Sequence, residues 1–160
     1  MNRKKIFHII IATGFGSGYF PIAPGTAGAI LATGIWYGLS FLLTPYHLLL
    51  TTAVCIVLFT FLGVWSSGFM EIYWGEDPSK VVIDEMVGVW IPLLAVNNEN
   101  TYYIYYALTA LLLFRLFDIF KPLGIRKMEA IKGGWGIMMD DILAGLYSLL
   151  ILCGIQWFIG

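Results

Sequence analysis

The sequence predicts an all-α integral membrane protein, a helical bundle of about five membrane-embedded helices with its N-terminus in the cytoplasm. Hydrophobic residues make up 59% of the 160 residues and charged residues 12%, against about 45–50% and about 25% in soluble globular domains. The mean hydropathy is +0.83, and long apolar runs alternate with short polar connectors. We expect one membrane domain over residues 1–160. Because the chain has no basic stripe, we expect no binding of nucleic acid.

Five apolar runs approach the roughly 20 residues that a membrane-spanning helix needs. They cover residues 28–43, 48–65, 81–96, 102–117 and 142–159. Thr26 is a suitable N-cap for the first helix, and Pro122 is expected to end the fourth at Lys121. The third run is interrupted by Asp84 and Glu85. As a helix it would cover about 24 Å, so it could just cross the membrane or dip in and return.

The distribution of basic residues favours a crossing by this third run. Lys and Arg occur before the first run, between the second and third, and between the fourth and fifth. The other two connectors, "TPYH" and "NNENT", contain neither. If residues 81–96 cross, every basic connector is cytoplasmic, as the positive-inside rule expects. The same topology brings the acidic residues of the apolar runs to the cytoplasmic ends of the helices.

The first 18 residues resemble a signal peptide, with a basic start and a short apolar run. His8 interrupts that run, and no clear cleavage site follows. We expect this segment to be retained as an amphipathic lead-in at the membrane surface.

The glycine-rich segment "GFGSGYFPIAPGTAG", residues 14–28, is a candidate anion-binding element. Pro24 and Gly25 predict a turn, and free backbone N–H groups at Gly25 and Thr26 would lie at the start of the following helix. Such groups and the helix dipole attract anions. The simpler alternative is a helix cap with a tight turn, since no Gly-Lys-Ser/Thr follows.

Three further segments place charges inside apolar runs. The first, "VVIDEMVGVW", holds a carboxylate pair that should pair with cations, bind a metal ion or be protonated. The alternative is a structural ion pair with Lys80 or Arg115. The second, "FRLFDIFKP", repeats charge every three residues, at Arg115, Asp118 and Lys121. Arg and Lys suit phosphate oxygens, although an intrahelical ion pair with a lysine reaching lipid phosphate would give the same pattern.

The third segment is "GGWGIMMDDILAG", where Asp140 and Asp141 precede the last apolar run. One aspartate near a helix N-terminus is explained by the helix dipole. Two adjacent ones point about 100° apart, so at least one should face neighbouring helices. Together the four segments predict a cluster of carboxylates, basic groups and backbone N–H groups at the cytoplasmic interface. All-oxygen ligands favour Mg²⁺, with Mn²⁺ also suitable, and the combination suits phosphoryl chemistry on a lipid phosphate.

These four segments closely resemble the phosphatidylglycerophosphatase A family, in the same order and with similar separations. The resemblance implies a Mg²⁺-dependent phosphatase of the bacterial inner membrane. The topology inferred above adds that the protein crosses this membrane several times and that its active site faces the cytoplasm. Such enzymes convert phosphatidylglycerophosphate to phosphatidylglycerol and inorganic phosphate in phospholipid biosynthesis. One departure is "KPLGI" at residues 121–125, where the family commonly reads "KPWPI". The change concerns the shape of the loop and removes no charged group.

Our assignment of roles is a hypothesis in which each candidate residue acts on the metal ion or on the phosphate. Asp84, Asp140 and Asp141 are expected to bind Mg²⁺, with Asp118 as another candidate and Glu85 as general base or further ligand. The basic groups Arg115 and Lys121 and the turn at Gly25 and Thr26 are expected to bind the phosphate. We favour attack by water over an aspartate nucleophile.

Other classes of protein remain as alternatives at this point. An intramembrane divalent-cation transporter or a metal-binding membrane subunit would also carry buried acidic residues. A CDP-alcohol phosphotransferase would use aspartates and a metal ion too, but its long signature is missing. The oligomeric state does not follow from the sequence.

Overall fold

The computed structural model describes residues 3–75 and 78–159, and within these ranges it contains helices and no strand. The helices are α1 (Arg3–Ala12), η1 (Ser17–Tyr19), α2 (Pro24–Ser40), α3 (Pro45–Trp74), α4 (Ile83–Leu93), α5 (Tyr103–Phe120), η2 (Ile125–Ala130) and α6 (Gly134–Ile159), where η marks short 3₁₀ turns. The all-α fold class is therefore confirmed.

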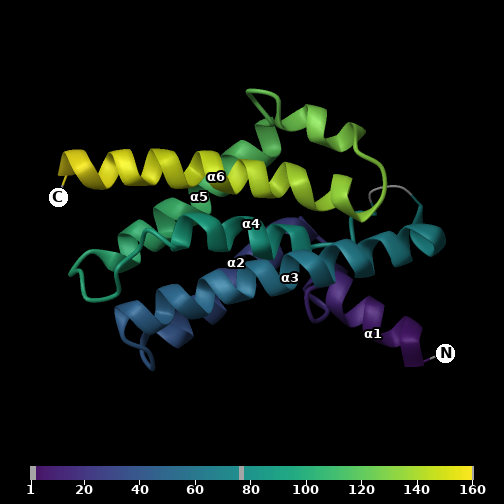
Figure 1. The fold of residues 1–160 in the computed structure, drawn as a ribbon, viewed down its shortest axis with the longest axis horizontal. Helices are drawn as coiled ribbons and strands as arrows, with labels where there is room; N and C mark the ends of the chain where they lie inside the picture. Colours follow the sequence, from purple (N-terminus) through teal and green to yellow (C-terminus); the bar gives the residue numbers. More distant parts are fainter. Residues whose placement is uncertain (1–2, 76–77, 160) are drawn as a thin grey trace.

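The helices from α2 to α6 run back and forth along the molecule (Figure 1). The connector between α2 and α3, the connector between α4 and α5, and the C-terminus lie at the left end of the view. The start of α1, the end of α3 and the connector after α5 lie in the right-hand half. The connectors that contain Lys or Arg therefore start from helix ends in the same half of the molecule. The number of membrane crossings and the orientation in the membrane stay predictions.

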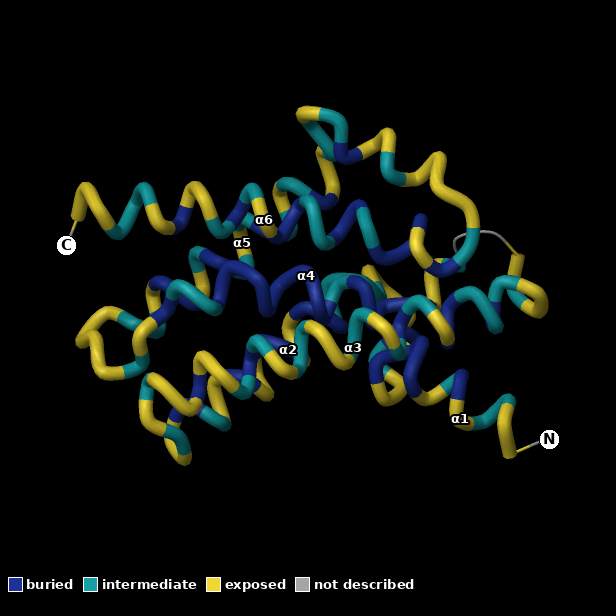
Figure 2. The backbone as a smooth tube through the Cα atoms, in the orientation of Figure 1, coloured by how far each residue is buried: buried dark blue, intermediate teal, exposed yellow. Residues whose placement is uncertain are grey.

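Helix α4 forms the centre of the bundle and is buried along most of its length (Figure 2). It packs against α2, α3, α5 and α6. Gly145 of α6 allows a close approach to α4, because a methyl group there would overlap the carbonyl oxygen of Gly88 and lie 3.0 Å from Cδ1 of Ile91. Small residues are typical of helix contacts in membranes, where close van der Waals packing replaces the hydrophobic driving force.

Within the described ranges, three helices are long and apolar enough to cross a membrane, namely α3, α5 and α6. Their outer surfaces expose many large apolar side chains, as expected for contact with lipid. Helix α4 has 11 residues and is about 16 Å long. It is shorter than the predicted run over residues 81–96 and does not by itself reach across a hydrocarbon core of about 30 Å. Five full crossings are thus not shown.

Several predicted helix boundaries are wrong in a way that matters for the site. Thr26 lies in the first turn of α2, and its predicted position as N-cap is taken by Ala23. Helix α6 begins at Gly134, eight residues before the predicted start, because three glycines at residues 133–136 do not prevent the helix. The predicted end of α5 is confirmed, with Lys121 as the C-cap in the left-handed region at φ 46°.

The N-terminal helix α1 is attached to α3 by a buried histidine. The Nδ1 atom of His8 lies 3.2 Å from Oγ of Ser66, and the imidazole stacks on Phe69 with ring centroids 4.1 Å apart. The N–H of Val82 donates to the carbonyl of Ala12 at 2.9 Å. These contacts tie α1 to α3 and to the residue before α4.

Candidate functional site

The first turn of α4 supplies two adjacent carboxylates. Asp84 is buried, and its Oδ1 accepts a hydrogen bond from the N–H of Glu85 at 3.0 Å. Glu85 leaves α4 in a different direction, and its carboxylate forms an ion pair with the guanidinium of Arg115 on α5. The ion pair with Arg115, which the sequence offered as an alternative to a metal site, is therefore present in the structure.

Helix α5 adds a second carboxylate to the same ion pair. Arg115 and Asp118 are one turn apart, with Nη1 of Arg115 2.9 Å from Oδ2 of Asp118. Arg115 thus links Glu85 and Asp118. Its Nε is buried and makes no hydrogen bond in the described part of the chain. A buried donor without an acceptor costs free energy, so an additional anion near this atom would stabilise the site.

Helix α6 places the two aspartates of the last segment within its second and third turns. Asp141 is the more deeply buried, at 3% exposed. The carboxylates of Glu85, Asp118 and Asp141 each offer an oxygen, and these oxygens lie within 4.8 Å of one another. Asp84 and Asp140 also interact electrostatically with Asp141. Five carboxylates from three helices therefore converge at one place.

Asp140 faces the end of α5 and the connector that follows. Its Oδ2 accepts from Nζ of Lys121 at 2.7 Å, and the same ammonium donates to Glu129 of η2 at 2.8 Å. Burial acts to lower the pKa of Lys121, but the contacts with Asp140 and Glu129 outweigh it and hold the pKa above its ordinary value. Lys121 is therefore a fixed positive charge beside the carboxylates. The Oδ1 atom of Asp140 is buried without a hydrogen-bond partner in the described residues.

The glycine-rich segment meets the site at the first turn of α2. A methyl group placed on Gly25 would overlap the carboxylate of Glu85 and lie 3.4 Å from Nη1 of Arg115. Only glycine allows the backbone to lie this close to the ion pair. The first hydrogen bond of α2 runs from the N–H of Ala27 to the carbonyl of Ala23. The N–H groups of Gly25 and of the half-buried Thr26 precede it, as the unpaired donors at a helix start do.

The donors present fit a hard divalent cation. Glu85, Asp118 and Asp141 offer only carboxylate oxygens, which are the ligands that Mg²⁺ and Mn²⁺ prefer. The buried and unpaired Oδ1 of Asp140 lies on the side chain next to this group. Five carboxylates near two basic residues would be costly to bury without a cation to balance them. This buried acidic group could therefore bind a metal ion.

All nine residues singled out in the sequence lie in or beside this cluster. The structure changes which of them are the best candidates for metal ligands. The three carboxylates with oxygens close enough to share an ion include Asp118, and do not include Asp84 or Asp140. Glu129, which shares Lys121 with Asp140, was missed. It lies in a polar connector where a single glutamate gives no periodic signal, so nothing in the sequence could have marked it.

The fold and the site define an α-helical protein of membrane type, with a carboxylate centre suited to phosphate esters. The model of the family described as phosphatidylglycerophosphatase A matches residues 10–156. A Bacteroides thetaiotaomicron protein provisionally named phosphatidylinositol-3-phosphatase is 58% identical over 160 residues, which is 100% of both chains. The phosphatidylglycerophosphatase A proteins of Haemophilus influenzae and Escherichia coli are 38% and 36% identical, covering 93% and 94% of this chain and 88% and 82% of their own.

The chain therefore belongs to the phosphatidylglycerophosphatase A family and is a lipid phosphatase. No solved structure gives a significant match. Membership of an enzyme family disfavours the transporter and the non-enzymatic membrane subunit as alternatives.

Proposed function

We propose that the protein is a Mg²⁺-dependent phosphatidylglycerophosphatase. It hydrolyses phosphatidylglycerophosphate to phosphatidylglycerol and inorganic phosphate at the cytoplasmic face of the bacterial inner membrane. The observation that carries this proposal is the junction of α4, α5 and α6, where Glu85, Asp118 and Asp141 converge beside two basic groups. The site lies in the half of the bundle from which the basic connectors start, which supports a cytoplasmic orientation (Figure 1).

In the proposed mechanism the carboxylates hold Mg²⁺ and the basic groups hold the phosphate. Asp118 and Asp141 are the central ligands, Glu85 beside them is a further ligand or the general base, and Asp84 and Asp140 stand next to them. The bound ion would act as a Lewis acid that stabilises negative charge on the phosphate oxygens. This division of work is common to enzymes that act on phosphate esters, where positioning and charge stabilisation dominate.

Arg115 and Lys121 bind phosphate oxygens in this proposal. The Nε of Arg115 offers a donor that residues 3–75 and 78–159 leave unused, and a guanidinium fork matches a phosphate group. The N–H groups of Gly25 and Thr26 point from the first turn of α2, where an anion is favoured. Lys121 also orients Asp140 through their 2.7 Å contact.

The reaction is attack by a water molecule on phosphorus. A new phosphorus–oxygen bond forms, the bond to the lipid oxygen breaks, and the lipid leaves as an alcohol after it has gained a proton. Glu85 either takes the proton from the attacking water or completes the ligand set. The two roles have different consequences. A general base contributes about 10²–10⁴-fold to the rate without affecting metal affinity, whereas a ligand contributes to metal affinity.

The names of the relatives divide between two lipids, and both carry a phosphate monoester on a phospholipid headgroup. We assign phosphatidylglycerophosphate because the family description names it. Two relatives that align with this chain over more than four fifths of their own length also carry that name.

The test is phosphate release by the purified protein in detergent micelles. The substrates are phosphatidylglycerophosphate, phosphatidylinositol 3-phosphate, phosphatidic acid and soluble glycerol phosphate, each with Mg²⁺ and with a chelator. We expect phosphatidylglycerophosphate to have the highest kcat/KM and the chelator to abolish release. The Asp141→Asn variant, which keeps the volume of the side chain, serves as the matched inactive control. A higher kcat/KM for phosphatidylinositol 3-phosphate would overturn the substrate assignment, and full activity in chelator would overturn the metal assignment.

A further inference from the structure

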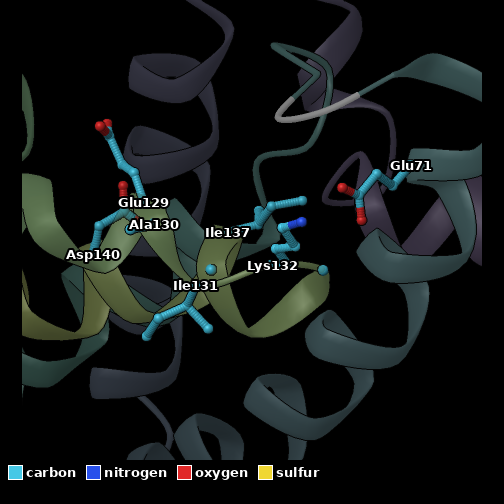
Figure 3. A pocket seen from close by; sticks show the side chains of 9 residues that line it. Glu71, Glu129, Ala130, Ile131, Lys132, Ile137 and Asp140 are labelled. Carbon is cyan, nitrogen blue, oxygen red and sulfur yellow. The ribbon is translucent and has the colours of Figure 1, made fainter.

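A cavity of about 250 Å³ lies beside the carboxylate cluster and shares Asp140 with it (Figure 3). Its walls come from the last turns of α3, the end of η2, the connector that follows η2, and the first turns of α6. Two glycines of α6 allow close backbone contacts beside the cavity. A methyl group on Gly134 would lie 2.9 Å from Cα of Val64 in α3, and one on Gly136 would overlap the carbonyl of Ile131 in the connector. The start of α6 is thus held against α3, and the connector lies close against α6.

Two charged side chains in this cavity have no partner among residues 3–75 and 78–159. Glu71 projects from α3 and Lys132 from the connector, and they point toward one another across the cavity (Figure 3). Neither side chain takes part in a hydrogen bond or an ion pair with the described residues. By contrast, Glu129 and Asp140 are both bound to Lys121, and Oδ1 of Asp140 is buried without a hydrogen-bond partner among the described residues.

These groups define the chemistry of a ligand that would fill the cavity. An ammonium group suits a phosphate anion, while carboxylates without donors suit hydroxyl groups. A volume of about 250 Å³ lies just below the roughly 300–1,000 Å³ of sites that enclose whole small molecules. The cavity therefore fits the headgroup of a lipid better than a complete lipid. A second cation held by Glu71, Glu129 and Asp140 is disfavoured, because Lys121 and Lys132 already place positive charge there.

We propose that this cavity binds the part of the substrate between the released phosphate and the diacylglycerol, a hydroxylated group joined through a phosphodiester. Lys132 binds the phosphodiester, and Glu71 accepts a hydrogen bond from the hydroxyl group. The inference rests on the proposed function, since phosphatidylglycerophosphate has such a headgroup of glycerol and phosphodiester. Phosphatidic acid has neither the hydroxyl group nor the phosphodiester, so the cavity would select against it.

The test compares Lys132→Met with Lys127→Met, a matched control on an exposed lysine of η2 that does not line the cavity. We measure KM and kcat for phosphatidylglycerophosphate and the inhibition constant of soluble glycerophosphoglycerol, which has the phosphodiester and hydroxyl groups without the terminal phosphate. We expect Lys132→Met to raise both KM and the inhibition constant about tenfold, the scale of one charge-assisted hydrogen bond. The value of kcat should stay within about twofold. The Glu71→Gln variant should raise the same two constants by a smaller factor.

An unchanged KM and inhibition constant in Lys132→Met, or equal changes in Lys127→Met, would overturn the assignment of the cavity. A rise in KM confined to phosphatidylinositol 3-phosphate would overturn the glycerol headgroup in favour of an inositol one. If the wild-type protein releases phosphate from neither lipid, the proposed function fails. Calorimetric binding of glycerophosphoglycerol to the wild type and to Lys132→Met still tests the cavity in that case, because weaker binding to the variant would support the subsite and equal binding would refute it.

Discussion

Replacing Gly25 by alanine should lower the activity of the protein without lowering the stability of its fold. A methyl carbon at this position would lie 2.8 Å from Cδ of Glu85, whereas nonbonded carbon atoms normally approach to about 3.5–4.0 Å. The Glu85 carboxylate would have to move by about 1 Å. A displacement of that size near reacting groups can cost about 100-fold in rate, so we expect kcat/KM to fall by about two orders of magnitude.

The same substitution should not weaken the helix, because alanine is favoured over glycine in helices by about 1 kcal/mol and Gly25 has an ordinary helical backbone. Gly34→Ala in the same helix is the matched control, since a methyl group there meets no atom within 4 Å. The assay is phosphate release with the midpoint of thermal unfolding in detergent. Gly25→Ala should lose activity at an unchanged or higher Tm, and Gly34→Ala should keep activity. A Gly25→Ala enzyme within about threefold of wild type would refute the proposed role of the Glu85–Arg115 pair.

Three further predictions concern the ligands, the lysine and the packing. Asp118→Asn and Asp141→Asn should each lower Mg²⁺-dependent phosphate release at least about 100-fold, and a rate near that of wild type in the folded variant would contradict the ligand assignment. Lys121→Met should lower kcat/KM about 10–100-fold, as loss of a partner that orients a ligand does. Because its pKa is raised above the ordinary 10.5, deprotonation of Lys121 occurs only at still higher pH. The wild-type rate between pH 6 and 9 should therefore show no loss from this residue, and a fall in that range that disappears in Lys121→Arg would refute the point. Gly145→Ala should lower the Tm, because overpacking costs about 1–3 kcal/mol of unfolding free energy. An unchanged Tm would contradict the close contact of α4 with α6.

Much of the fold and site could be predicted because the relevant signals are local or compositional. Long apolar runs predicted α3, α5 and α6, and the proline after Lys121 predicted the end of α5. Charges inside apolar runs marked the site, since a carboxylate in such a run must face the interior of the bundle.

Other features depend on packing that the sequence does not display. The true start of α6 at Gly134 places Asp140 and Asp141 well inside the helix, although the glycines there predicted a break. One of them, Gly134, is needed for contact with Val64 of α3, which tertiary structure alone reveals. The group of Glu85, Asp118 and Asp141 likewise depends on how three helices are rotated about their axes. Glu71 and Lys132 become neighbours only through the folded connector.

We propose that the carboxylates at the junction of α4, α5 and α6 hold a divalent metal ion. Binding of Mn²⁺ to the purified protein, followed by electron paramagnetic resonance, is a direct test of this metal site. We expect a saturable site in the wild type, competition by Mg²⁺, and at least about tenfold weaker binding in Asp141→Asn. Equal binding by the wild type and the variant, or no saturable binding by the wild type, would contradict it.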